Sequence, residues 1–261
     1  MKTIITPIIT GIVMLFSFSN LRAQTWNTQI VHSGSINGPR SLRIAPDGNP
    51  VIFERVDVHN FLIVKWNGNT WQTVYAGSED WWFGLNTVSG VLVGDTYLVT
   101  LGWTDYGSFN ILRILLMQIN RNGAVTYQER FDGDSPALSV SNNGRVRIAY
   151  RYNSALYVKS YNPIDNTSSN LSLVDGSVGE NIDVATGTDN RTWISYYDYT
   201  SKDLKVAQSD TSGIAGWNIW TVDAQGDVGM YSSIWVDQTN TAHVAYYDAT
   251  DQKLKYAVFN P

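Results

Sequence analysis

Two adjacent tryptophans beside two acids are the residues of this sequence that most readily suggest chemistry. They stand in the segment Glu79-Asp80-Trp81-Trp82-Phe83. Neighbouring side chains of an extended chain point to opposite sides, so one core cannot take both tryptophans. An aromatic ring can cover the C–H face of a sugar, and carboxylates accept hydrogen bonds from its hydroxyl groups. We therefore expect Glu79, Asp80, Trp81 and Trp82 to bind carbohydrate; the alternative is a lid that plugs a channel.

A strand-like segment with a central aromatic residue occurs five times along the chain. The segments are residues 51–55, 101–105, 148–152, 194–198 and 244–248. Their central residues, which lie 50, 47, 46 and 50 positions apart, are Phe53, Trp103, Tyr150, Tyr196 and Tyr246. Self-similarity with a period of about 40–50 residues indicates a stacked or circular repeat fold. We expect these rings to fill the space between neighbouring repeats, because flat aromatic side chains bury a large area.

The two residues after each central ring differ between repeats and stand where a strand would meet a loop. They include four carboxylates: Glu54, Asp105, Asp198 and Asp248. A glycoside hydrolase would need two carboxylates about 5–9.5 Å apart across a bound sugar, and these residues could supply them. The alternative for Asp198 and Asp248 is that they cap their own turns. The segments also contain five residues that we expect to contact a ligand: Arg55, Trp103, Arg151, Tyr197 and Tyr247.

Alternating apolar and polar residues, rich in β-branched and aromatic types, predict short strands from residue 24 onward. The last repeat contains three of them, at residues 233–236, 243–247 and 254–259. A fourth lies between earlier repeats, at residues 71–75, 125–131, 171–174 and 217–222. Asn-Gly and Asp-Gly steps supply the positive φ angles of tight hairpins, and no segment has helical periodicity. Four antiparallel strands in each of five units predict an all-β fold, a five-bladed β-propeller; a two-sheet sandwich is the alternative.

The last repeat lacks a fourth strand, and a matching segment stands at the other end of the sequence. Residues 26–31 share Trp, Asn and Val with the corresponding positions of residues 217–222. We expect this N-terminal strand to complete the last blade and lock the ring, which would protect the sheet edges from aggregation. Residues 24–261 would then be a single domain.

The loops of a propeller determine the face on which a site is expected. The loop that leads into each blade opens on the same face as the loop after its second strand. The loop that leads into blade 2, at residues 77–90, is the longest of these and contains both adjacent tryptophans. We therefore expect function on this face.

Composition narrows the classes of partner. The formal net charge is −5, and no cluster of Lys and Arg is present, so the sequence does not predict nucleic-acid binding. The chain has no cysteine and three widely spaced histidines. We therefore expect no metal site, no cofactor and no disulfide. A glycan or polysaccharide is the partner that we expect, and a surface protein is the alternative.

The first 23 residues have the pattern of a secretory signal peptide. Lys2 precedes an interrupted apolar run from Ile4 to Phe18, and Ala23 offers a small residue at the cut. The run is too short to span a bilayer core of about 30 Å comfortably. We expect cleavage near Ala23 and a secreted or periplasmic protein.

Two phrases near the C-terminus resemble a repeat of many exported bacterial proteins. They are Ser195-Tyr196-Tyr197-Asp198 followed by residues 203–207, and Ala245-Tyr246-Tyr247-Asp248 followed by residues 253–257. Such proteins are described as sialidase-like or lectin-like β-propellers, so the resemblance implies this fold and export. The Ser-x-Asp-x-Gly-x-Thr-Trp box of true sialidases is absent from the sequence.

Lectin-like carbohydrate binding on the loop-rich face is the function that we expect. The first alternative is a glycoside hydrolase with a carboxylate pair near the central channel, and the second is a structural propeller or one that binds a surface protein. Equivalent sites in several blades would favour a multivalent lectin, whereas one irregular site would favour an enzyme.

The expected N-terminal strand can be tested by truncation. Deleting residues 24–32 from the mature protein should cost far more stability than deleting an ordinary terminus, because it would open the last blade. Thermal melting of both proteins measures the difference. A truncated protein that melts like the mature chain would rule out this closure.

Overall fold

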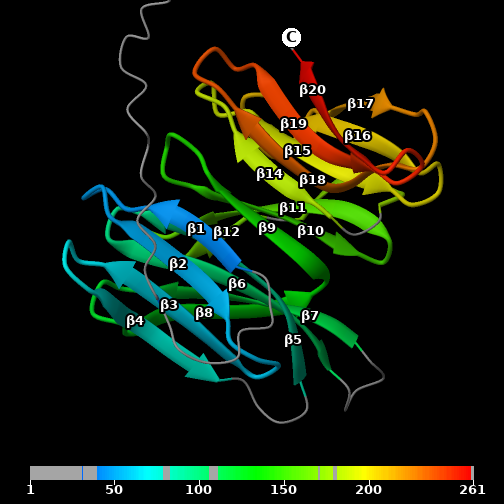
Figure 1. Cartoon of the computed structure of the whole chain (residues 1–261). Helices are drawn as coiled ribbons and strands as arrows, with labels where there is room; N and C mark the ends of the chain where they lie inside the picture. Colours follow the sequence, from blue (N-terminus) through cyan, green and yellow to red (C-terminus); the bar gives the residue numbers. More distant parts are fainter. Residues whose placement is uncertain are drawn as a thin grey trace, which may run out of the picture. The chain divides into compact units, whose positions relative to one another are not determined.

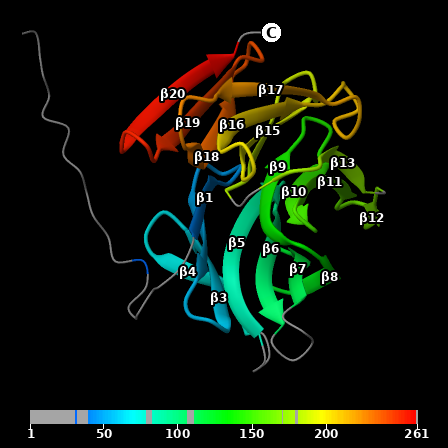
Figure 2. The same ribbon diagram turned by 90° about the vertical axis from the view of Figure 1, so that its right-hand side faces the viewer.

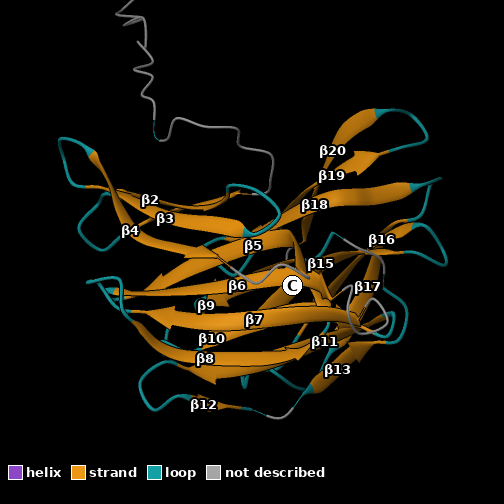
Figure 3. Ribbon diagram, turned by 90° about the horizontal axis from the view of Figure 1, so that it is seen from below, coloured by secondary structure: helices purple, strands orange, loops and turns teal. Residues whose placement is uncertain are grey.

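The structure is a computed structural model of the 261-residue chain. It describes residue 31 and residues 40–78, 83–105, 111–169, 171–178 and 181–259. Contacts divide the chain into residues 1–32 and 33–261, and every described strand belongs to the second unit. Strands are the regular secondary structure of this unit (Figure 3). Within the described ranges, no helix is long and apolar enough to cross a membrane.

The described strands form five antiparallel sheets, which we number blades 1 to 5 in chain order (Figure 1). Blade 1 contains β1 (Arg40–Ile44), β2 (Pro50–Arg55), β3 (Asn60–Trp66) and β4 (Trp71–Ser78). Blade 2 contains β5 (Phe83–Val93), β6 (Thr96–Asp105), β7 (Ile111–Ile119) and β8 (Val125–Asp132). Blade 3 contains β9 (Asp134–Val140), β10 (Val146–Tyr152), β11 (Ala155–Asn162), β12 (Thr167–Ser168) and β13 (Ser172–Asp175). Blade 4 contains β14 (Asp183–Thr186), β15 (Thr192–Asp198), β16 (Asp203–Gln208) and β17 (Asn218–Asp223). Blade 5 contains β18 (Val228–Val236), β19 (Ala242–Asp248) and β20 (Lys253–Phe259).

The hairpin between the first two strands of each blade is closed by a residue with positive φ. Glycine and asparagine adopt this conformation at the lowest cost, which is why Asn-Gly and Asp-Gly steps predict such turns. The residues are Gly48, Gly94, Gly144, Asn190 and Asn240, with φ between 58° and 80°. The predicted tight turns are confirmed in the five blades, and the three strands predicted near the C-terminus are confirmed in blade 5. Blade 3 divides its outer edge between β12 and β13, which both pair with β11.

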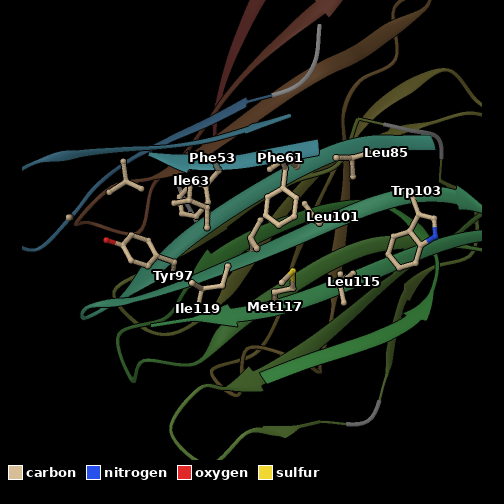
Figure 4. Close-up of a cluster of buried hydrophobic side chains, with 14 residues drawn as sticks. Phe53, Phe61, Ile63, Leu85, Tyr97, Leu101, Trp103, Leu115, Met117 and Ile119 are labelled. Carbon is tan, nitrogen blue, oxygen red and sulfur yellow. The ribbon is translucent and has the colours of Figure 1, made fainter. Parts of the chain in front are cut away.

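Buried apolar clusters join each described sheet to the next one in the chain. One cluster lies between blades 1 and 2 (Figure 4), and others join blades 2 and 3, 3 and 4, and 4 and 5. Trp103, Tyr150, Tyr196 and Tyr246 are buried in these clusters, each facing the preceding blade. The expectation that these four rings pack between repeats is confirmed. We call their place in the second strand the ring position.

Phe53 does not occupy the ring position of blade 1. Its side chain packs against blade 2, in the same cluster as Trp103 (Figure 4), and a Cβ atom on Gly90 would come within 2.2 Å of its ring. Because successive side chains of a strand face opposite sides of the sheet, the residue that faces the other way is Glu54. The predicted equivalence of Phe53 with the other rings is therefore wrong by one residue, and Glu54 stands at the ring position.

Blades 4 and 5 add a polar connection to the preceding blade. The Tyr196 hydroxyl donates to Asp175 at the end of blade 3 (2.7 Å). The Lys205 ammonium lies 3.5 Å from Asp175 and 2.5 Å from Asp198 of its own blade. We call this arrangement the Tyr–Asp–Lys clasp.

The clasp recurs one blade later. The Tyr246 hydroxyl donates to Asp223 (2.7 Å), and Lys255 pairs with Asp223 and, at 3.5 Å, with Asp248. The phrase that repeats in the sequence of blades 4 and 5 therefore encodes a contact between blades.

The loop that leads into blade 2 is shorter than predicted. β4 continues to Ser78 and β5 begins at Phe83, so most of residues 77–90 belong to strands. β5 is 11 residues long and includes Gly84 and Gly90. Glycines within a segment favour a loop prediction, but pairing with β6 continues across both of them. Residues 79–82 lie outside the described residues. So do residues 26–30, and the N-terminal closing strand stays a prediction.

Lys205→Met should destabilise the protein by removing the partner of a buried carboxylate. Burial acts to raise the pKa of Asp198, but Lys205 and the N–H groups of Ser201 and Thr200 outweigh it, so the pKa is lowered. Leaving Asp198 unpaired should cost about 2 kcal/mol near neutral pH, which lowers Tm by about 4–8 °C in a chain of this size.

The same substitution should show a characteristic pH dependence. A lowered pKa in the folded state stabilises the fold above the unfolded pKa of about 4, and this contribution is lost on acidification. The difference in Tm between the wild type and Lys205→Met should therefore shrink from pH 7 towards pH 3. Lys202→Met is the control, since the Lys202 side chain is 61% exposed and lies 3.6 Å from Asp227. An equal loss in both variants would contradict the clasp.

Candidate functional site

A cavity of about 790 Å³ lies between the first strands of the five blades. β1, β5, β9, β14 and β18 all contribute to its lining, and Figure 2 shows β1, β5, β9 and β18 toward the middle of the sheets. Pockets for small ligands typically measure about 300–1,000 Å³. The cavity is therefore large enough to hold one, and we call it the central cavity.

Five equivalent residues, one on the first strand of each blade, lie at one level of the central cavity, and two of them differ from the small residues found in the other three blades. The five residues at this level are each paired with the residue three places before the ring position. They are Arg43, Ser89, Ser139, Ala185 and Trp235. Three blades thus place a small side chain at this level, whereas blade 1 has a guanidinium and blade 5 an indole.

Arg43 is a partly buried cation of this lining. Burial lowers its pKa, and the negative charge of Asp183 opposes that shift. Its Nη1 donates to the carbonyl oxygen of Leu42 (2.9 Å). Within the described ranges Arg43 forms no ion pair at salt-bridge distance, so most of its N–H donors are available to a ligand.

Asp183 is the acidic residue of the described cavity lining. Its Oδ2 accepts hydrogen bonds from the Ser233 hydroxyl (3.0 Å) and the Ile234 N–H (2.9 Å), which join blade 4 to blade 5. Burial raises the pKa of Asp183, although these donors and Arg43 act in the opposite direction. At the equivalent position the other blades have uncharged residues: Ser41, Thr87, Ala137 and Ser233.

The predicted catalytic residue Glu54 lies beside this cavity. Its side chain is almost fully buried, and Oε1 lies 3.4 Å from Nε of Arg40. Arg40 belongs to the cavity lining, whereas Glu54 does not. The structure thus places Glu54 where it can orient Arg40.

Asp198 and Asp248 are buried at the ends of equivalent strands, where they hold turns. Asp198 accepts hydrogen bonds from the N–H groups of Thr200 (2.8 Å) and Ser201 (3.2 Å), and Asp248 from the N–H of Asp251 (2.9 Å). Each also belongs to a Tyr–Asp–Lys clasp. This geometry matches the capping alternative, and neither carboxylate lines the central cavity.

A second cavity, of about 400 Å³, brings together Trp103 and Arg151 at the junction of blades 2 and 3. Asp134 holds the Arg151 guanidinium by bonds from Nε (2.8 Å) and Nη2 (2.5 Å). Trp103 is buried, so its ring offers little surface for stacking. The pocket therefore presents an oriented cation without an open aromatic face.

The remaining predicted residues are dispersed. Arg55 donates to the carbonyl oxygen of Leu85 in blade 2, and the Tyr197 hydroxyl donates to Asp227 (2.8 Å). Tyr247 packs near Tyr231 with ring centroids 6.5 Å apart. Glu79, Asp80, Trp81, Trp82 and the side chain of Asp105 lie outside the described residues.

Sequence reasoning did not assign Arg43, Asp183 or Trp235 to a site. All three stand on first strands, whose sequences repeat less clearly than those of the second strands. Comparing the first strands by their pairing partners would have identified them, since a charge or an indole replaces a small or uncharged residue. Such a comparison depends on knowing how each first strand pairs with its second strand. The prediction for blade 1 is shifted by one residue, so it does not align Arg43 with its counterparts.

The comparisons with known proteins concern the fold. No protein-family model matches the sequence, and no curated protein matches it. An α-L-arabinofuranosidase from Fusarium graminearum is similar in structure, with a TM-score of 0.62, 8% identity and coverage of 86% of this chain and 77% of that one. An α-L-arabinanase from Penicillium chrysogenum has a TM-score of 0.58, 12% identity and coverage of 86% and 77%. An endo-arabinase from Bacteroides thetaiotaomicron has a TM-score of 0.53, 11% identity and coverage of 87% and 94%. At these identities the likeness supports a propeller fold.

Proposed function

We propose that this protein is a glycan-active propeller, similar to a glycoside hydrolase, that binds its glycan in the central cavity. The proposal rests on two charged residues, Arg43 and Asp183, which line a cavity of about 790 Å³. The equivalent positions of the other blades have uncharged residues. Arginine N–H groups donate to sugar oxygens, and serine hydroxyls at the same level can donate or accept. The arabinan-degrading neighbours in structure favour cleavage over binding alone.

Asp183 is the residue that we propose as proton donor. A carboxyl group whose pKa is raised by burial keeps its proton closer to neutral pH, and the pKa of Asp183 is raised in this way. In glycoside hydrolysis such an acid protonates the leaving oxygen, while a second carboxylate attacks the anomeric carbon or activates the water that does. The described lining provides no second acid. Among the carboxylates that the sequence predicts for catalysis, Asp105 is the one whose side chain lies outside the described residues.

Binding without cleavage is the second candidate function. The single carboxyl group in the described cavity lining favours it, because hydrolysis of this type uses two. A lectin-like protein would need only the donors and acceptors of the cavity. A role in binding a surface protein stays a prediction from the sequence.

Asp183→Asn and Arg43→Ala separate these functions. If Asp183 donates the proton, its substitution should lower turnover of arabinan or another cleaved polysaccharide by about 10²-fold or more while binding persists. Arg43→Ala should weaken binding by about 10-fold, equivalent to ~1.4 kcal/mol. Sugar release and calorimetric titration measure the two effects.

The control is Asp165→Asn, which changes an exposed acid in a turn of blade 3. Binding that is unaccompanied by turnover would select the lectin-like function. If a broad panel of polysaccharides were neither bound nor cleaved, the proposal would fail.

We also propose that the protein is exported and that residues 1–23 are removed. The basic start, the interrupted apolar run and Ala23 support this. Mass spectrometry of protein recovered from the native host should find Gln24 as the first residue. A mature chain that begins at Met1 would contradict it.

A further inference from the structure

Tyr231 has a backbone conformation that a bulky residue rarely adopts. Its φ angle is 52°, in the left-handed region where the side chain of an L-residue crowds the backbone. A β-bulge produces this conformation, because the register of β18 with β19 shifts between Met230 and Ser233. The chain therefore holds an aromatic residue at a strained position.

Two other blades have a residue with positive φ at the equivalent position, but neither residue is aromatic. Ser135 of blade 3 and Asn181 of blade 4 each stand two residues before the counterpart of Ser233 on their first strand. Their φ angles are 51° and 71°. Asparagine adopts this conformation more readily than most residues do, whereas a large side chain costs stability there. Backbone strain of this kind is concentrated at functional sites, so the tyrosine is better explained by binding than by folding.

The side chain of Tyr231 lies on the side of β18 that lines the central cavity. Along this strand Tyr231, Ser233 and Trp235 are exposed, whereas the residues between them are buried. Ser233 and Trp235 line the cavity, and alternate residues of a strand face the same side. Tyr231 lies within about 7 Å of Ser233 along the strand, and the Ser233 hydroxyl donates to Asp183 (3.0 Å). Tyr231 thus continues the cavity lining toward the loop that leads into blade 5.

The ring of Tyr231 is accessible and has an aromatic neighbour. Its exposed fraction is 74%, and its ring centroid lies 6.5 Å from that of Tyr247, with the two planes inclined by 48°. Tyr247 is one of the residues that the sequence predicts to contact a ligand. An aromatic ring can cover the C–H face of a sugar, and a phenolic hydroxyl can donate to or accept from its hydroxyl groups. The two tyrosines therefore supply a surface suited to a sugar ring.

We propose that Tyr231 and Tyr247 form a sugar-binding subsite at the rim of the central cavity. The subsite rests on the proposed glycan function, because it binds the sugar unit next to the one held by Arg43 and Asp183. Its ligand is therefore a chain of at least two sugar units rather than a free monosaccharide. The strained backbone presents the ring at the rim, and this is the reason that the position has a tyrosine instead of the serine or asparagine of other blades.

Tyr231→Asn tests this subsite, since it introduces the amino acid that blade 4 has at the same position. Relief of strain should raise Tm by about 2–4 °C, whereas loss of the ring should weaken the binding of oligosaccharides by about 10-fold. Scanning calorimetry measures Tm. Calorimetric titration with chains of one to six sugar units, prepared from arabinan and from the polysaccharide that binds best, measures affinity. The monosaccharide should be affected least.

Two matched variants serve as controls. Tyr231→Phe keeps the ring, so it should leave Tm unchanged and retain most of the affinity. Tyr199→Asn changes a tyrosine that is also 74% exposed but lies in the turn after β15 of blade 4, and it should alter neither quantity.

Three results would overturn the subsite. If Tyr231→Asn binds oligosaccharides as tightly as the wild type does, the subsite fails while the proposed function stands. If Tyr231→Asn lowers Tm, the tyrosine serves the fold and the subsite fails as well. A wild-type protein that binds no chain of the series would refute the proposed function, and the subsite with it.

Discussion

The structure depends on one constraint: each sheet has two apolar faces and can bury them only against its neighbours in chain order. The ring position meets this constraint in blades 2 to 5, where an aromatic side chain fills the space toward the preceding blade. Small residues such as Ala149 and Ser195 on the opposite face leave room for the next first strand. Burying a side chain of this size stabilises a fold by about 1.5–3 kcal/mol, so a sheet without a neighbour would lose much of its core.

The same constraint explains why most acids of the repeat are structural. A carboxylate near the junction of two blades is removed from water and must be paired. Asp198 and Asp248 are paired with lysines and with N–H groups of their turns. Asp175 and Asp223 each accept a hydrogen bond from a tyrosine hydroxyl. The acids that recur from blade to blade therefore serve to join neighbouring blades. The residues left for ligand chemistry are those that occur once, such as Arg43 and Asp183.

Strands, turns and blade order could be predicted from the sequence because they rest on local properties. Alternation of side chains defines a strand, and Gly or Asn supplies the positive φ of a hairpin, as at Gly144 and Asn240. The face that a strand presents is less well encoded. A shift of one residue moves Phe53 from one side of its sheet to the other, and the aromatic type of the residue gives no indication of the side.

The sequence by itself determined the all-β repeat, the four-strand plan and the burial of the rings from blade 2 onward, because each follows from periodicity within about 50 residues. Only the tertiary structure decided which acids pair with lysines and which line a cavity. Arg43 and Asp183 are 140 residues apart in the chain, and first strands converge only after every blade has packed on its neighbour. The two residues line the same cavity because of the order in which the sheets pack, and no local sequence pattern predicts that order.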